Sequence, residues 1–302
     1  MKSLDQYANE YFNSNLNALH SFYPGLRVEV LKRELEIYLF GVESHNGKRL
    51  KEYPFLQGHH QKAMSFFSST DKGIPLSYIT GKAFFYKNDF FVNPDVLIPR
   101  SETEILVEDA VGFLKKMRNE KGNPGEDLKV LEVGTGSGAL ILSLLSDLDF
   151  SVDALATDIS GKALEMARKN YFHGQYGIHP ETKLSFLEAD RLFFNERERL
   201  TFDLIVSNPP YIKFNEINGL DKDVRYYEPK VALSGGIDGL SKIRLVVSKS
   251  SNLIKKSGKL FLEIGFTQTR EVLKILQLYG FYNNRVIKDL GRKNRCIIST
   301  KI

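Results

Sequence analysis

One stretch of the chain indicates its fold class, Leu131-Glu132-Val133-Gly134-Thr135-Gly136-Ser137-Gly138. It overlaps a short apolar strand pattern at 129–133 and leads into an apolar helix pattern at 139–145. Its alternate glycines allow the backbone to turn sharply and to approach a ligand closely. The N-terminus of the following helix carries unpaired N–H groups and a partial positive charge, which suit a carboxylate or a phosphate. The stretch therefore predicts a strand–loop–helix unit that binds a ligand.

Strand and helix patterns continue to alternate after this loop. The predicted elements are strands at 152–158, 184–189, 202–207 and 259–264, helices at 162–171, 239–256 and 267–279, and β-rich segments at 284–290 and 296–299. Such alternation predicts an α/β fold, in which helices cover both faces of a mainly parallel sheet. Ligands of such sheets bind at the carboxyl ends of the strands, where the glycine loop is placed.

The first hundred residues differ from the rest of the chain. Apolar residues such as Leu31 and Leu35 recur at helical spacing, which predicts a small helical domain. Aromatic residues then flank the polar turn signal Lys87-Asn88-Asp89, a pattern typical of a β-hairpin. We therefore expect three parts, which are a helical domain at 1–72, a connector with a β-hairpin at 73–99, and a catalytic domain at 100–302.

The composition is that of an ordinary globular protein. The chain has 302 residues, of which 42% are hydrophobic and 26% charged, and this excludes wholesale disorder, collagen-like repeats and a disulfide scaffold. Its net charge of +5 permits a nucleic-acid partner without requiring one. Cys296 is the only cysteine of the sequence, so no intramolecular disulfide can form. The His59-His60 pair lacks metal-ligand spacing, and we expect no metal.

Neither a membrane span nor a targeting segment is expected. No apolar run approaches the roughly 18 residues that a membrane helix needs. The N-terminus carries Asp5 and Glu10 and lacks the basic and then apolar residues of a signal peptide. We therefore expect a cytoplasmic protein without a membrane partner, and a monomer as its default state.

The glycine loop is compatible with two cofactors. The spacing of Gly134, Gly136 and Ala139 fits a dinucleotide-binding fingerprint. The spacing of Gly134, Gly136 and Gly138 fits a loop that binds S-adenosylmethionine equally well. Asp158, at the end of the second predicted strand, would hold ribose hydroxyls in either case. The loop alone therefore leaves the cofactor open.

A second motif, Asn208-Pro209-Pro210-Tyr211, ends the fourth predicted strand. Its two prolines fix the φ angle and remove two backbone donors, so the loop is stiff. Asn208 offers an amide oxygen, the Pro209 carbonyl is a second acceptor, and Tyr211 forms an aromatic wall. Two acceptors beside a flat face suit a planar NH₂ group.

Holding both hydrogens of such a group would prepare its nitrogen for methylation. An amide nitrogen is a poor nucleophile because its lone pair is delocalised, and two acceptors aim that lone pair at a sulfonium methyl group. The acceleration comes from orientation and from electrostatic stabilisation of the developing positive charge. We therefore expect Asn208, Pro209 and Tyr211 to be catalytic, and Pro210 to join them in binding the substrate.

Four segments together resemble the HemK/PrmC family, the methyltransferases of peptide chain release factor glutamine. The resemblance covers most of residues 74–302. Its segments are Ile74-Pro75-Leu76-Ser77-Tyr78-Ile79-Thr80-Gly81, Leu97-Ile98-Pro99-Arg100-Ser101-Glu102-Thr103-Glu104, the glycine loop with residues 208–211, and Asp223-Val224-Arg225-Tyr226-Tyr227-Glu228-Pro229. Enzymes that methylate amino groups of DNA or RNA share the Asn-Pro-Pro-Tyr motif, so the combination carries the specificity.

The resemblance implies a class I S-adenosylmethionine-dependent methyltransferase, with a Rossmann-like seven-stranded sheet and an N-terminal helical domain for substrate recognition. It implies S-adenosylmethionine as the methyl donor. The acceptor would be the side-chain amide of the glutamine in the Gly-Gly-Gln loop of release factors, a protein methylation that belongs to translation termination. The implied cofactor contacts are Gly134, Thr135, Gly136, Ser137, Gly138, Asp158, Arg191 and Asn208. Arg191 replaces an aromatic residue that the family often has, and either Arg191, lying flat on the ring, or Phe193 would make the adenine contact.

Three other functions stay open beside this one. An amino-methyltransferase acting on DNA or RNA bases would use the same motif, although duplex-DNA enzymes usually carry a larger target-reading domain. An oxidoreductase with a nicotinamide cofactor fits the glycine loop but gives residues 208–211 no role. A non-catalytic binding module would have no need of Asn208. Release factors are therefore the expected partners, with no direct nucleic-acid contact required.

Overall fold

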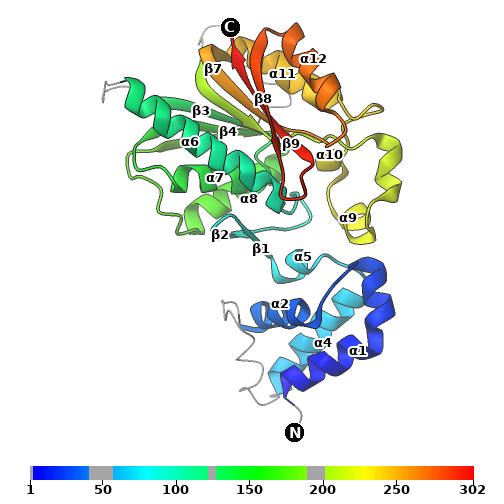
Figure 1. Cartoon of the computed structure of the whole chain (residues 1–302). Helices are drawn as coiled ribbons and strands as arrows, with labels where there is room; N and C mark the ends of the chain where they lie inside the picture. Colours follow the sequence, from blue (N-terminus) through cyan, green and yellow to red (C-terminus); the bar gives the residue numbers. More distant parts are fainter. Residues whose placement is uncertain (1–2, 41–56, 122–126, 189–200) are drawn as a thin grey trace. The chain divides into compact units, whose positions relative to one another are not determined.

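The computed structural model describes residues 3–40, 57–121, 127–188 and 201–302 (Figure 1). The chain divides into two compact units. The first contains Met1–Lys82, Val92–Pro94 and Asn218–Glu228, and the second contains Ala83–Phe91, Asp95–Ile217 and Pro229–Ile302. Each unit has a hydrophobic core of its own.

Helices build the first unit. They are α1 (Leu4–Phe22), α2 (Val28–Phe40), α4 (Gln57–Asp71), α5 (Leu76–Thr80) and α9 (Lys222–Tyr227). A capping box starts α1, because the Ser3 hydroxyl accepts from the Gln6 N–H and the Gln6 side chain accepts from the Ser3 N–H. Leu31, Leu35 and Phe66 are fully buried in the core between these helices. Helices are thus present where the apolar spacing predicts them.

The short helix α9 belongs to this first unit although it comes late in the chain. The Tyr227 hydroxyl donates to the Lys72 carbonyl at 2.6 Å. The Lys222 ammonium lies 5.2 Å from the centre of the Phe22 ring. The segment Asn218–Glu228 therefore completes a unit that is otherwise formed by the N-terminal helices.

A seven-stranded sheet organises the second unit (Figure 1). Its strands are β3 (Leu128–Val133), β4 (Val152–Asp158), β5 (Lys183–Glu188), β6 (Phe202–Ser207), β7 (Ile254–Glu263), β8 (Phe281–Lys288) and β9 (Asn294–Lys301). Their order is β5-β4-β3-β6-β7-β9-β8. The pairs from β5 to β7 are parallel, and β9 is antiparallel to both β7 and β8. The predicted mainly parallel sheet is confirmed.

The strand order reverses between β3 and β6. The chain proceeds from β3 to β4 and β5 on one side, and from β6 to β7 on the other. In open α/β sheets, ligands bind at the carboxyl ends of the strands beside such a reversal. Val133 at the end of β3 pairs with Ser207 at the end of β6, so the two predicted binding loops leave the sheet next to each other.

Helices cover both faces of this sheet. α6 (Glu104–Lys121) and α7 (Ala139–Ser146) share one core with Val130 and Leu204. α11 (Ser241–Leu253) and α12 (Thr269–Leu278) share a second core with Leu131 and Ile205. Neighbouring residues of a strand point to opposite faces, which explains this division. The connections carry α8 (Gly161–His173), η1 (Ser101–Thr103), η2 (Phe214–Gly219) and α10 (Lys230–Leu233).

The predicted hairpin is present as a two-stranded sheet of β1 (Lys82–Phe85) and β2 (Asn88–Phe91). Tyr86 occupies the turn with a left-handed φ of 58°. Its hydroxyl donates to the Asp147 carboxylate at 2.7 Å, and Phe85 and Phe90 are buried in the core below α6 and α7. The hairpin is thereby attached to the second unit.

Several predicted elements differ from the structure by one to five residues at a boundary, among them the helix expected at 239–256, and several helices, α6 included, are missing from the prediction. The helix expected at 239–256 begins at Ser241, because Gly239 has a left-handed φ of 75°. It ends at Leu253, since Ile254 already pairs with Phe202 and starts β7 before the predicted residue 259. The helix α6 was not predicted, although its buried face repeats at helical spacing. No helix among the described residues has the length and apolar character of a membrane span.

Candidate active site

The glycine loop between β3 and α7 has a conformation that requires glycine. Gly134, Gly136 and Gly138 have φ angles of 79°, 55° and 81°, which L side chains rarely adopt. The N–H groups of Gly134 and Thr135 donate to the Thr157 carbonyl on β4 at 2.8 and 2.9 Å. The loop is therefore fixed to the neighbouring strand.

The glycines differ in what surrounds them. A Cβ atom at Gly134 or Gly136 would meet nothing within 4 Å, so open space borders the loop there. A Cβ atom at Gly138 would lie 3.2 Å from that of Ala167 on α8. The first two glycines thus leave room for a ligand, and the third allows close packing of the loop against a helix.

Asp158 ends β4 and holds the loop from the side. Its carboxylate accepts from the Gly136 N–H at 2.9 Å and from the Ser160 N–H at 3.0 Å. Burial raises the pKa of this carboxyl, while the backbone N–H groups act in the opposite direction. The predicted cofactor-binding residues Gly136 and Asp158 are thus in direct contact.

Glu132 is a buried carboxyl directly below the glycine loop. Its side chain is 2% exposed and accepts a hydrogen bond from the Thr135 hydroxyl. Burial, with a smaller contribution from the nearby charge of Asp158, raises the pKa of Glu132 to about 8 against the hydrogen bond from Thr135. A positive charge bound at the loop would favour the ionised form of this carboxyl.

One cavity at the carboxyl ends of β3, β4 and β6 brings several of the predicted residues together, whereas Gly138 and Tyr211 line neither this cavity nor its neighbour. Its walls include Gly134, Gly136 and Asp158 as well as Asn208, Pro209 and Pro210. A neighbouring cavity is lined by Thr135, Ser137 and Asn208. Arg191 and Phe193 lie outside the described residues. No group of three or more metal-ligating side chains occurs among the described residues.

The Asn-Pro-Pro-Tyr loop is held at both ends. Ser207, the last residue of β6, donates its hydroxyl to the Val133 carbonyl at 2.7 Å. The Asn208 side-chain NH₂ group donates to the Thr103 hydroxyl at 3.0 Å. The Tyr211 carbonyl accepts from the Gln268 side chain at 2.9 Å. The loop therefore has little freedom to turn its acceptors away from the cavity.

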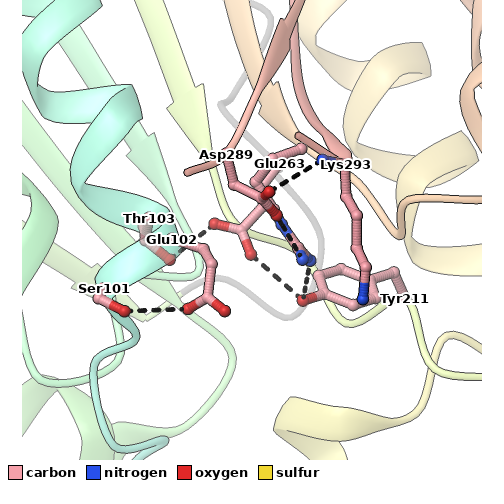
Figure 2. Close-up of polar contacts among 8 residues, drawn as sticks. Ser101, Glu102, Thr103, Tyr211, Glu263, Asp289 and Lys293 are labelled. Carbon is pink, nitrogen blue, oxygen red and sulfur yellow. Dashed lines mark hydrogen bonds and ion pairs between the residues drawn. The ribbon is translucent and has the colours of Figure 1, made fainter. Parts of the chain in front are cut away.

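Glu263, the last residue of β7, accepts hydrogen bonds from two hydroxyl groups near this loop (Figure 2). The Thr103 hydroxyl donates to its Oε2 at 2.6 Å, and the Tyr211 hydroxyl donates to its Oε1 at 3.2 Å. Burial raises the pKa of Glu263 to about 7. Arg295 donates to the Tyr211 hydroxyl at 3.4 Å and forms an ion pair with Asp289 at 3.0 Å.

Thr103 and Glu263 are not among the residues that the sequence predicts to be functional. Thr103 lies in a segment that carries the family resemblance, but nothing in the sequence indicates a partner 160 residues away. Glu263 gave a usable signal, because it is a carboxylate at the end of an apolar strand, where ligands bind. Glu104, which follows Thr103 in the sequence, instead accepts from the Tyr86 N–H and connects α6 to the hairpin.

Two neighbouring acceptors therefore border a cavity that also contains a glycine loop. The Asn208 NH₂ group is occupied by Thr103, so its amide oxygen is the atom left for a ligand. The Pro209 carbonyl belongs to the same stiff loop. The arrangement can hold the two hydrogens of a planar NH₂ group beside a nucleotide-type cofactor.

Comparisons with known proteins agree with this geometry. Residues 111–220 match the methyltransferase small domain family. A release factor glutamine methyltransferase of Clostridium acetobutylicum is 35% identical over 251 residues, which are 83% of this chain and 84% of that protein. One of Agrobacterium fabrum is 33% identical over 246 residues, covering 82% and 81% of the two chains.

A solved structure shares the fold. The crystal structure of the hMettl16 catalytic domain in complex with MAT2A 3'UTR hairpin 6 aligns with a TM-score of 0.51. The alignment covers 82% of both chains at 12% sequence identity. At this identity the likeness concerns the fold, a class I methyltransferase sheet, and not the substrate.

Proposed function

The chain belongs to the release factor glutamine methyltransferase family, and from that premise we propose how its residues carry out the reaction. It is an S-adenosylmethionine-dependent enzyme that methylates a release factor glutamine. We propose that the acceptor is the side-chain amide nitrogen of the glutamine in the Gly-Gly-Gln loop. The observation that carries this proposal is the common cavity, which Asn208 and Pro209 line together with Gly134, Gly136 and Asp158.

The residues at the glycine loop fit S-adenosylmethionine. Open space borders Gly134 and Gly136, where a Cβ atom would otherwise point. Asp158 lies at the end of β4, in a position to accept from hydroxyl groups of a ribose. The buried Glu132 carboxyl provides negative charge close to a bound cation. We propose that Thr135, Ser137 and Gly138 complete this cofactor site, together with Asn208 and, from outside the described residues, Arg191.

The Asn-Pro-Pro-Tyr loop orients the acceptor amide. S-adenosylmethionine supplies an electrophilic methyl group on a sulfonium. The Asn208 amide oxygen accepts one hydrogen of the glutamine NH₂ group, and the Pro209 carbonyl accepts the other. Tyr211 and Pro210 restrict the position of the glutamine side chain. Because both acceptors are held before the substrate arrives, the rate gain comes from orientation and from the charge that develops on the nitrogen.

The release factor has to be recognised by a larger surface than the catalytic loop. A single glutamine is too common to specify one loop, so a wide contact surface is needed. We propose that the helical domain at 1–72 supplies part of that surface, with 73–99 as connector and 100–302 as catalytic domain. We further propose that the protein acts as a monomer in the cytoplasm, without direct nucleic-acid or membrane contact.

Methyl transfer from labelled S-adenosylmethionine tests the function. The purified chain is incubated with a release factor, and in parallel with the same factor carrying alanine in place of its loop glutamine. Label on the first factor alone supports the proposal, and label on both factors places the acceptor elsewhere. Label on RNA or DNA but on neither factor would refute the proposal in favour of a nucleic-acid amino-methyltransferase.

A further inference from the structure

A buried chain of hydrogen bonds connects the catalytic loop to the end of β7. It runs from the Asn208 NH₂ group to the Thr103 hydroxyl at 3.0 Å, and from that hydroxyl to the Glu263 carboxylate at 2.6 Å. Thr103 is 5% exposed and Glu263 is 1% exposed. Figure 2 shows how Thr103, on η1, points its hydroxyl at Glu263.

The number of donor hydrogens in this series of hydrogen bonds determines the orientation of the Asn208 amide. A threonine hydroxyl has one hydrogen, and above about pH 7 Thr103 gives it to the ionised Glu263 carboxylate, which can only accept. Thr103 can therefore only accept from Asn208, so the NH₂ group of Asn208 must face it. The Asn208 oxygen is then left for the cavity, where an acceptor is required.

The same carboxylate holds the other end of the loop. The Tyr211 hydroxyl donates to Oε1 of Glu263, while the Thr103 hydroxyl occupies Oε2. Between Asn208 and Tyr211 stand two prolines, which keep the intervening backbone stiff. One buried side chain therefore determines the position of the first and the last residue of the loop.

We propose that Thr103 and Glu263 are positioning residues for methyl transfer, with Glu263 acting through the Thr103 hydroxyl to keep the Asn208 oxygen turned toward the acceptor amide. A flipped Asn208 amide would present hydrogens to the hydrogens of the glutamine NH₂ group, and the two groups would repel each other. The inference rests on the proposed function of Asn208, since Thr103 and Glu263 act through that residue and through Tyr211.

A matched pair of substitutions at Thr103 tests the inference. Thr103→Val keeps the shape and removes the hydroxyl, whereas Thr103→Ser keeps the hydroxyl. We expect Thr103→Val to lower kcat for the release factor by on the order of 10- to 100-fold. The affinity for S-adenosylmethionine, measured by calorimetry, should stay unchanged, and Thr103→Ser should recover most of the loss. An equal loss in both variants, or full activity in Thr103→Val, would overturn the inference.

A double-mutant cycle separates positioning from general damage. If Thr103 acts only through Asn208, Thr103→Val should have no further effect on kcat in an Asn208→Ala background. If the two losses in kcat instead multiply, Thr103 acts independently of Asn208 and its proposed positioning role is wrong.

A measurement without substrate distinguishes this inference from the proposed function. The side-chain NH₂ signals of Asn208 are identified in a ¹⁵N-correlated spectrum by their absence in Asn208→Ala. We expect them to shift in Thr103→Val, where one hydrogen loses its acceptor, and to keep their positions in Thr103→Ser. Unchanged NH₂ signals in Thr103→Val would overturn the proposed action of Thr103 on Asn208. An inactive wild-type chain would refute only the proposed function.

Discussion

Replacing Glu263 by glutamine is expected to stabilise the folded chain while it lowers methyl transfer. Glu263 is 1% exposed, and burial raises its pKa from an ordinary value of 4.5 to about 7. A raised pKa means that the ionised carboxylate is less stable in the folded chain than in the unfolded chain. The stability associated with this group is therefore present below pH 4.5 and lost as the pH rises through about 7.

The size of this effect follows from the two pKa values. One pKa unit corresponds to roughly 1.4 kcal/mol, so the change from 4.5 to about 7 amounts to roughly 3 kcal/mol above pH 7. A glutamine carries no charge and escapes this cost, but its NH₂ group meets the oxygen of either Thr103 or Tyr211. One of the two hydroxyls must then give up its present acceptor, at a cost of about 1 kcal/mol. We therefore expect Glu263→Gln to gain roughly 2 kcal/mol at pH 8.

Urea unfolding followed by circular dichroism at pH 5 and pH 8 measures this change. At pH 5 the wild-type carboxyl is largely protonated in the folded chain, so the advantage of Glu263→Gln should nearly vanish. Asp203→Asn is a matched control, because Asp203 is equally buried but forms an ion pair with Lys255 at 2.9 Å. Its neutralisation should lower stability. A Glu263→Gln variant less stable than wild type at pH 8 would refute the reasoning.

The same group predicts a pH dependence of the reaction. As the pH falls through about 7, Glu263 gains a hydrogen and Thr103 is no longer forced to accept from Asn208, so methyl transfer should decrease. The titratable and charged groups around Glu263 are Tyr211, Arg295, Glu102 and Cys296, and Arg295 is itself paired with Asp289. Single-turnover rates from pH 6 to pH 9 should show this decrease toward low pH in the wild type. If the decrease persists in Glu263→Gln, a group other than Glu263 causes it.

Three further substitutions test the cofactor and acceptor sites. Asn208→Ala should lower turnover on the order of 100-fold and change the Kd of S-adenosylmethionine far less, because Asn208 is only one of the proposed cofactor contacts. A Kd that rises as much as turnover falls would contradict the acceptor role. Asp158→Ala removes one charge-assisted hydrogen bond to the glycine loop and one to Ser160, and it should raise that Kd on the order of 10- to 100-fold by calorimetry. An unchanged Kd would contradict the assignment. Gly138 has a φ of 81°, and an added Cβ atom would lie 3.2 Å from that of Ala167. Gly138→Ala should therefore lower the free energy of unfolding by about 1–2 kcal/mol. An unchanged urea midpoint would speak against a strained loop.

Local sequence patterns predicted the elements that surround the binding loops. The strands Val152–Asp158 and Phe202–Ser207 have the predicted bounds, because each apolar run is closed by residues that favour turns. The helix end at Leu253 was missed because Ile254 continues the apolar spacing of the helix. Its pairing with Phe202 depends on the neighbouring strand, which helical periodicity does not describe.

The functional residues divide in the same way. The glycine loop and Asn208 were found because their chemistry is written in adjacent residues. Thr103 and Glu263 were not, because their contact depends on where η1 meets the end of β7, far apart in the chain. Glu102 and Glu104 flank Thr103 in the sequence. The uncharged Thr103 between them makes the contact with Asn208.

The position of α9 has a consequence for the order in which the protein is made. Segment Asn218–Glu228 completes a unit that otherwise consists of the first 82 residues and Val92–Pro94. Chains emerge from the ribosome N-terminus first, and their early domains often fold before synthesis ends. Here the Lys72 carbonyl and the Phe22 ring must wait for Tyr227 and Lys222, by which time β3 to β6 have already been translated. We therefore expect the helical unit to acquire its full protease resistance only after most of the catalytic sheet has been synthesised.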